Sequence, residues 1–160
     1  MKLTKPQIIN SFSKHPKYPI RPKNFVISDN DYFCPKIDIV KNIIYPAFKI
    51  WLISCGLDQW TRKWDCENFA DGFKLFSCAY HSQEMDDNIA GIAIGVINYI
   101  SEGNQQERKG PHAINIIYSP NIKVNNDNLQ KFDMFFLEPQ TGELYDLSEK
   151  EFKSIFTVYI

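Results

Sequence analysis

The stretch that decides the fold is WDCENFADGFKLFSCAY, residues 64–80. Asp65 is a good helix N-cap, Glu67 favours the first turn of a helix, and Trp64 and Phe69 occupy the two positions of a hydrophobic staple. This pattern predicts a helix whose first residue is Cys66. The aromatic side chains that recur on one face of this helix are Phe69, Phe73, Phe76 and Tyr80. We expect that face to pack against a sheet, and Gly72 to mark the place where a strand crosses closely.

The chain before this helix divides into an arm and another helix. Prolines at positions 6, 16, 19 and 22 predict that residues 1–28 form an irregular N-terminal arm, with a short extended piece at 25–27. From Ile37 the apolar residues recur at helical spacing as far as Gly56, which suits a C-terminal cap. Pro46 should kink this helix. The folded core is then expected to span residues 29–160.

The residues after the two helices are typical of strands. Ile- and Val-rich or aromatic runs occur at 92–100, 113–118, 132–137, 143–147 and 155–159, and turn-forming residues separate them. Helices followed by antiparallel strands indicate an α+β fold. A chain of 160 residues is long enough for one hydrophobic core and too short for two, so we expect a single domain.

Composition excludes several classes of protein. The formal net charge of −1 argues against nucleic acid as a partner, since phosphate-binding domains usually have a basic excess. Residues 1–17 have no apolar core of a secretion signal, and no later segment has the ~20 apolar residues that cross a bilayer, so we expect no membrane partner. The four cysteines have no CxxC or other zinc spacing, which favours free thiols in a reducing compartment: Cys34, Cys55, Cys66 and Cys78.

Cys66 is the candidate nucleophile. The first turn of a helix offers unpaired N–H groups and the positive end of the helix dipole, and both stabilise a thiolate. The alternative is a small apolar residue that starts an aromatic helix. A catalytic cysteine needs a base, and His15 lies in the proline-rich arm while His81 lies about 20 Å along the same helix. His112, at the mouth of the strand that begins at residue 113, is therefore the candidate base.

Glu138 is the candidate third member of the site. The strands that hold His112 and Glu138 should be antiparallel neighbours, and residue 125, midway between the two positions, falls in the turn-rich segment 124–127. Directly opposed residues share a face of the sheet, so Glu138 could orient the His112 ring. Asp133 and Asn115 are the alternatives to Glu138. For the developing oxyanion, the Cys66 N–H and the Gln59 side chain are candidate donors. The alternative for Gln59 is an ordinary surface position before Trp60.

Four blocks together carry a resemblance to a known family: DNDYFCP (29–35), WDCENFA (64–70), GPHAIN (110–115) and EPQTGE (138–143). They are similar to blocks of the papain-like domain at the C-terminus of the Marasmius-type fungal agglutinin and of related phage and bacterial proteins. The resemblance covers roughly residues 29–147. It implies a papain-like fold and a Cys–His–Glu triad at Cys66, His112 and Glu138. It also implies calcium activation, although the sequence itself requires no cofactor and gives no metal ligands.

The sequence therefore predicts a papain-like thiol hydrolase of the cysteine peptidase or amidase/transamidase type, acting on a protein or peptide. The alternative is a non-enzymatic phage or bacterial protein that keeps the fold and grips a partner protein in its cleft. Sugar binding is not expected, because the chain has no room for the β-trefoil of the fungal relative. The resemblance to phage and bacterial proteins implies the cytoplasm of a bacterium or of a phage-infected cell as the location.

Overall fold

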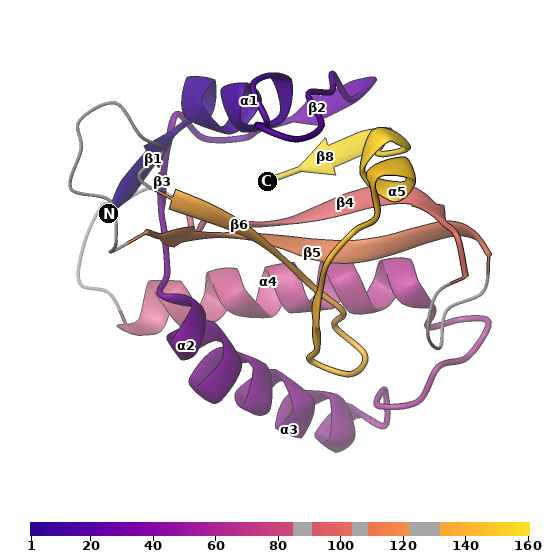
Figure 1. Ribbon diagram of the computed structural model, residues 1–160. Coiled ribbons are helices and arrows are strands. Elements are labelled where there is room, and N and C mark those ends of the chain that lie inside the picture. The colour runs from indigo at the N-terminus through magenta and orange to yellow at the C-terminus, as the bar shows by residue number, and fades with distance from the viewer. Residues whose placement is uncertain (85–90, 104–108, 122–131) are drawn as a thin grey trace.

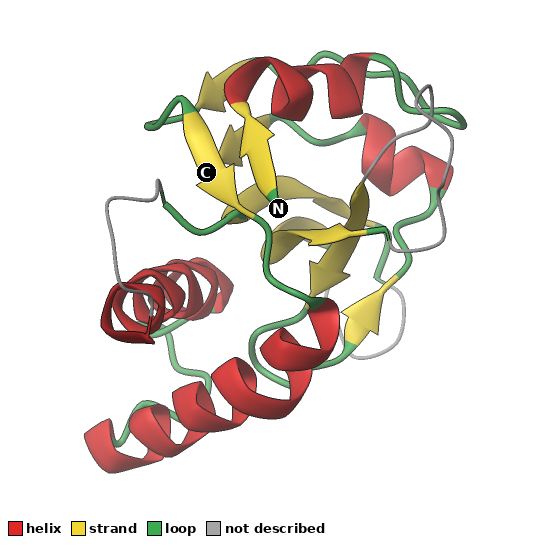
Figure 2. Cartoon of the chain, turned by 90° about the vertical axis from the view of Figure 1, so that its left-hand side faces the viewer, coloured by secondary structure: helices red, strands yellow, loops and turns green. Residues whose placement is uncertain are grey.

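The computed structural model describes residues 1–84, 91–103, 109–121 and 132–160. A six-stranded sheet forms the middle layer. Helices α1 and α5 lie over one face of it, and α3 and α4 lie over the other (Figures 1 and 2). The helices are α1 (Lys5–Ser13), α2 (Ile37–Ile39), the π-helical turn η1 (Val40–Ile44), α3 (Tyr45–Cys55), α4 (Cys66–Glu84) and α5 (Glu149–Lys153). Within the described part of the chain, no helix combines the length and apolar character needed to cross a bilayer.

The order of strands in the main sheet is β2-β8-β4-β5-β6-β7. Every neighbouring pair is antiparallel except β2 and β8, which are parallel. A small second sheet joins β1 and β3. The strands are β1 (Lys2–Thr4), β2 (Asn24–Val26), β3 (Asp31–Phe33), β4 (Ile94–Ser101), β5 (Gly110–Pro120), β6 (Phe132–Leu137), β7 (Leu144–Tyr145) and β8 (Thr157–Tyr159). The predicted α+β class is thereby confirmed.

The prediction of an irregular arm at residues 1–28 is wrong. Residues Lys5–Ser13 form helix α1, because Pro6 suits the first turn of a helix and the Gln7 side chain accepts a hydrogen bond from the Thr4 N–H at 2.8 Å. Ile8 and Phe12, one turn apart on this helix, are fully buried against the sheet. The N-terminal segment is therefore part of the core.

The helix predicted between residue 37 and Gly56 is present, with a change of winding before Pro46. The Tyr45 N–H donates to the Val40 carbonyl five residues back, which makes the turn Val40–Ile44 π-helical. After this turn, α3 begins at Tyr45, so Pro46 lies in its first turn. Proline lacks an N–H there, but the first N–H groups of a helix have no partner within the helix in any case. Gly56 ends α3 in the left-handed conformation, at φ 67°, as predicted.

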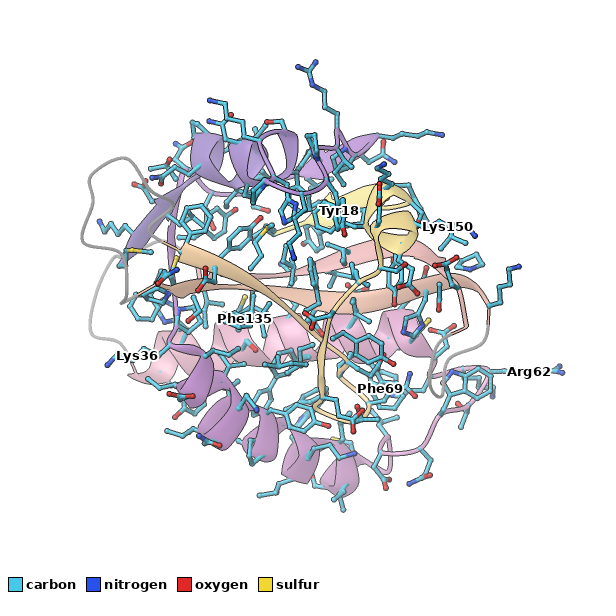
Figure 3. All side chains as sticks on the ribbon, viewed as in Figure 1. Tyr18, Lys36, Arg62, Phe69, Phe135 and Lys150 are labelled. Atoms are coloured by element: carbon cyan, nitrogen blue, oxygen red, sulfur yellow. The ribbon has the colours of Figure 1, made fainter. Side chains whose placement is uncertain are left out.

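Helix α4 packs its aromatic face on α3 and the sheet. Phe69 and Phe73 are buried in the same hydrophobic cluster as Phe48 of α3 and Ile94 of β4, and Figure 3 shows the labelled Phe69 below α4, on the side of α3. The expectation for Gly72 is wrong, because a Cβ atom there would contact the side chains of Trp64 and Phe48, at 3.5 and 3.7 Å, rather than a strand.

Helix α5 was not predicted. Ser148 caps it by accepting a hydrogen bond from the Glu151 N–H at 3.2 Å, while the Glu151 carboxylate accepts from the Ser148 N–H at 3.0 Å. This helix lies between the strands predicted at 143–147 and 155–159, and it places Phe152 in the core beside α1.

Candidate active site

Helix α4 begins at Cys66 because its first turn is capped by side chains. The Asp65 carboxylate accepts hydrogen bonds from the N–H groups of Glu67 and Asn68, at 3.2 and 3.3 Å, and the Asn68 side chain accepts one from the Asp65 N–H at 3.2 Å. The Trp64 and Phe69 rings meet edge to face with centroids 5.8 Å apart. These contacts confirm the predicted cap and staple. The cap leaves the Cys66 N–H as the candidate oxyanion donor.

The Cys66 side chain is half-buried and packs against a cluster of small residues at one end of the sheet. This cluster consists of Ala70 from α4, Val96 from β4 and Ala113 from β5. Ala113 is the chain neighbour of His112, so the fold brings the candidate nucleophile to the segment that carries the candidate base.

Asn115 ties α4 to the sheet just below Cys66. Its side chain is fully buried, and its Nδ2 donates to the Ala70 carbonyl at 2.9 Å and to the Gly95 carbonyl at 3.0 Å. The side chain therefore faces α4 and does not face His112. Asp133 lies at the other end of β6 and accepts a hydrogen bond from Asn121 at 3.0 Å. Neither alternative to Glu138 is placed beside His112.

His112 and Glu138 form a buried pair. The His112 Nε2 lies 2.9 Å from the Glu138 Oε2, and the two side chains are 10% and 6% exposed. The other carboxylate oxygen, Oε1, accepts a hydrogen bond from the Gln140 N–H at 3.0 Å. The Tyr99 ring meets the His112 ring edge to face at 5.7 Å. A carboxylate held in this way fixes the orientation and the tautomer of the imidazole.

The predicted register that led to Glu138 was wrong by two residues. Asn115 pairs with Leu137, and extending that ladder by one position sets Glu138 opposite Ile114 instead of His112. A shift of two keeps every side chain on its face, so His112 and Glu138 are diagonal neighbours, with Cβ atoms ~7 Å apart, within reach of long side chains. The predicted turn at 124–127 lies outside the described residues.

A tight turn after β6 presents the Glu138 carboxylate. The Gly142 N–H donates to the Glu138 carbonyl at 2.7 Å, and the Glu138 N–H donates to the Glu143 carbonyl at 2.9 Å. Gly142 adopts φ 79°, a conformation that favours glycine. Sequence reasoning reached Glu138 from the expected register of its strand, and the Glu-Pro-x-x-Gly-Glu block added a resemblance, but neither identified what holds the turn in place.

Cys66 packs against Ala113, and Ala113 is the residue after His112 on β5. Side chains alternate along the strand, so Ala113 faces α4 and Cys66, while His112 starts on the other side with Tyr99. The His112 Nε2 is within hydrogen-bond distance of the Glu138 carboxylate.

Two further sequence predictions find less support in the geometry. The Gln59 side chain is exposed and its Nε2 donates to the Asp58 carboxylate at 2.9 Å, so it would have to leave this partner to serve an oxyanion. Within the described ranges, no three His, Cys, Asp or Glu side chains gather as ligands for a metal ion. The calcium implied by the resemblance therefore has no cluster of carboxylates among the described residues.

The other three cysteines differ from Cys66. Cys34 is buried, and burial raises the pKa of its thiol to about 11. Burial also raises the pKa of Cys78. Cys55 is exposed at the C-terminal end of α3. The first two thiols are therefore poor nucleophiles at neutral pH, whereas Cys55 is the one to control for in any labelling experiment.

Comparisons with known proteins give structural likenesses only. Scans against protein-family profiles and against curated proteins find no match. A solved structure of a Polyporus squamosus lectin bound to the human-type influenza-binding epitope Neu5Aca2-6Galb1-4GlcNAc matches with a TM-score of 0.70 and 17% identity, over 99% of this chain and 49% of that one. A complex of PSL1a with E64 matches with a TM-score of 0.70 and 18% identity, over 99% and 50%. This chain thus spans about half the length of the solved structures it matches.

These matches correct our expectation about partners. We expected a protein or peptide as the partner and no sugar binding, whereas a matched structure is a lectin with a bound oligosaccharide. The expectation of a protein or peptide partner and the expectation of no sugar binding are both overturned by this likeness. The absence of a trefoil was a weak basis for excluding sugars, since it concerned the length of the chain and not the surface that the chain presents.

Proposed function

We propose that this protein is a papain-like thiol hydrolase or acyl transferase that acts at an amide bond. The observation that carries the proposal is the buried pair of His112 and Glu138, beside the capped helix end that presents Cys66. A buried carboxylate that orients an imidazole next to a helix-tip thiol is the arrangement that nucleophilic cysteine chemistry requires.

In the proposed reaction, the Cys66 thiolate attacks the amide carbonyl and forms a tetrahedral intermediate, whose oxyanion the Cys66 N–H stabilises. The protonated His112 gives its proton to the leaving amine, and a thioester on Cys66 results. Water or a second amine then attacks the thioester, with His112 as the base, and releases the acyl group. Glu138 holds Nε2 throughout, so Nδ1 is the ring nitrogen that would serve Cys66 and the leaving group.

The fold and one ligand of the matched structures support this proposal. The likeness to a chain that forms a complex with E64 suggests this compound as a probe. E64 carries an epoxide, and a thiolate that opens the ring forms a stable thioether.

The test is covalent labelling at pH 7 with iodoacetamide and with E64, followed by mass spectrometry of the intact protein and its peptides. We expect Cys66 to react first, and His112→Ala to slow its labelling by roughly 100-fold or more, because the thiolate loses its imidazolium partner. Cys66→Ala should remove the E64 adduct.

The matched control is Cys55→Ala, which removes the exposed thiol of α3 and should leave Cys66 labelling unchanged. Labelling of Cys66 that proceeds no faster than that of Cys55, and that does not change in His112→Ala, would refute the hydrolase.

Carbohydrate binding without catalysis is the second candidate function. The likeness to a lectin bound to a sialylated oligosaccharide favours it. Titrating the protein with Neu5Aca2-6Galb1-4GlcNAc, followed by two-dimensional NMR, should give saturable shifts confined to one surface if the candidate is right. Unchanged spectra at millimolar oligosaccharide would rule out this ligand.

A further inference from the structure

We propose that Tyr45 is a positioning residue for the candidate site: it holds the turn Glu138–Gly142 against α3, so that the Glu138 carboxylate reaches His112. This inference deepens the proposed function and rests on it, since the pair matters for catalysis only if Cys66 is the nucleophile. Figure 1 shows the segment between β6 and β7 descending past α4 toward α3.

The Tyr45 ring and Gly142 fit against each other without space for a side chain. A Cβ atom at position 142 would lie 2.2 Å from the Tyr45 Cε1 and 2.6 Å from its Cζ. The bare backbone of the turn therefore rests directly on the ring. Glycine is needed at position 142 for two reasons: the turn requires a left-handed φ there, and the Tyr45 ring leaves no room for a side chain.

The Tyr45 hydroxyl holds the same turn by a hydrogen bond. It donates to the Gln140 carbonyl at 3.2 Å, and the Lys49 Nζ, one turn further along α3, donates to the same oxygen at 3.4 Å. The Gln140 N–H in turn donates to Oε1 of the Glu138 carboxylate. The other oxygen of that carboxylate, Oε2, contacts the His112 ring. An unbroken series of contacts thus runs from α3 to the candidate base.

Tyr45 is itself held firmly in place. Its ring packs on Phe48 and Phe73, with centroid distances of 6.4 and 6.0 Å, and the π-helical turn before it sets the direction in which α3 starts. Burial, followed by the Glu138 and Glu143 carboxylates, raises the pKa of its hydroxyl well above the ordinary tyrosine value. The phenol therefore stays neutral and remains a hydrogen-bond donor at neutral pH.

The test is the variant Tyr45→Phe, which removes the hydroxyl and keeps the ring. The readout is the titration of the His112 imidazole by NMR, which needs no substrate and no activity. An oriented carboxylate raises the pKa of an imidazole, so Glu138→Gln should lower the His112 midpoint by about one pH unit. We expect Tyr45→Phe to lower it by about half a unit in the same direction, because the turn loosens and the carboxylate spends less time on the ring.

The matched control is Tyr18→Phe, a half-buried tyrosine near α5, well away from α3 (Figure 3). It should leave the His112 midpoint at the wild-type value. A Tyr45→Phe midpoint equal to that of Tyr18→Phe, in an experiment in which Glu138→Gln does shift it, would overturn the positioning role. A second variant, Gly142→Ala, pushes the turn off the ring and should give a shift at least as large as Tyr45→Phe.

The two proposals fail in different ways. If Cys66 shows no selective labelling while Tyr45→Phe still shifts the His112 midpoint, the hydrolase is wrong and the role of Tyr45 stands as a structural one. If Cys66 is labelled selectively and the midpoint does not respond, the hydrolase stands and Tyr45 is not what positions Glu138.

Discussion

Replacing Phe48 with alanine should lower the free energy of unfolding by about 4 kcal/mol. Phe48 is fully buried and lies at the centre of the aromatic cluster between α3 and α4. Its ring is within 5.2–6.4 Å, centroid to centroid, of four others: Tyr45, Trp51, Phe73 and Phe76. The substitution removes the ring that all four share, and rigid helices cannot close the resulting cavity.

Urea denaturation at equilibrium measures this loss as a shift of the midpoint at constant slope. Ile53→Ala is the matched control, since Ile53 belongs to the same helix and is 60% exposed, so its free energy of unfolding should change by less than about 0.5 kcal/mol. A Phe48→Ala loss below about 1.5 kcal/mol would mean that α3 does not depend on this cluster.

Gly95→Ala should lower the free energy of unfolding by about 3 kcal/mol, from the addition of one methyl group. Gly95 lies within β4, and an added Cβ would be 2.5 Å from the Tyr159 carbonyl oxygen and 2.6 Å from the Ile160 Cγ1. The first of these atoms belongs to the backbone of the neighbouring strand, so relief requires β8 to move away from β4. That movement breaks the pairing of Val96 with Tyr159.

Thermal unfolding followed by circular dichroism gives the comparison. Gly72→Ala is the control, because its Cβ would meet only side chains at ordinary contact distance, in the middle of a helix. That substitution should raise the free energy of unfolding by about 0.5–1 kcal/mol. Equal melting temperatures for the two variants would show that β8 yields freely, contrary to the packing described for Gly95.

The helix that carries Cys66 could be predicted from the sequence because its signals are local. Asp65, Trp64 and Phe69 act within one turn of the helix start, and the structure reproduces each of these contacts. The end of α3 at Gly56 was predictable for the same reason. Interactions within a few residues leave a pattern in the sequence that the rest of the fold did not override.

The pairing of His112 with Glu138 could be predicted only in part. The parity of the two positions was correct, so the side chains share a face, but the register depended on the number of residues in a long connection. The presence of turn-forming residues does not determine how many residues belong to the loop, so it does not fix the register of the strands. Asn115 was kept as an alternative to Glu138 because its partner, the Ala70 carbonyl, lies on a helix that is distant in sequence.

The N-terminal arm was misjudged because four prolines were treated as equivalent. Pro6 is at the start of a helix, where its fixed φ is favourable, whereas the other three lie in the irregular segment that follows. The pattern Ser148-x-x-Glu151 was available as a signal for α5, but the five-residue helix lies between two expected strands, in a segment to which no element was assigned. Tyr45 left no signal, since its partners in the turn of Glu138 are distant in sequence.

The position of β8 between β2 and β4 has a consequence for how the chain acquires its structure. Asn24 pairs with Thr157, so this edge of the sheet closes only when residues separated by more than a hundred positions meet. Contacts of such long sequence separation slow folding, and we expect assembly on the millisecond-to-second scale of β-rich domains. During synthesis on the ribosome, the segment Asn24–Val26 cannot pair with β8 until residues Thr157–Tyr159 have emerged.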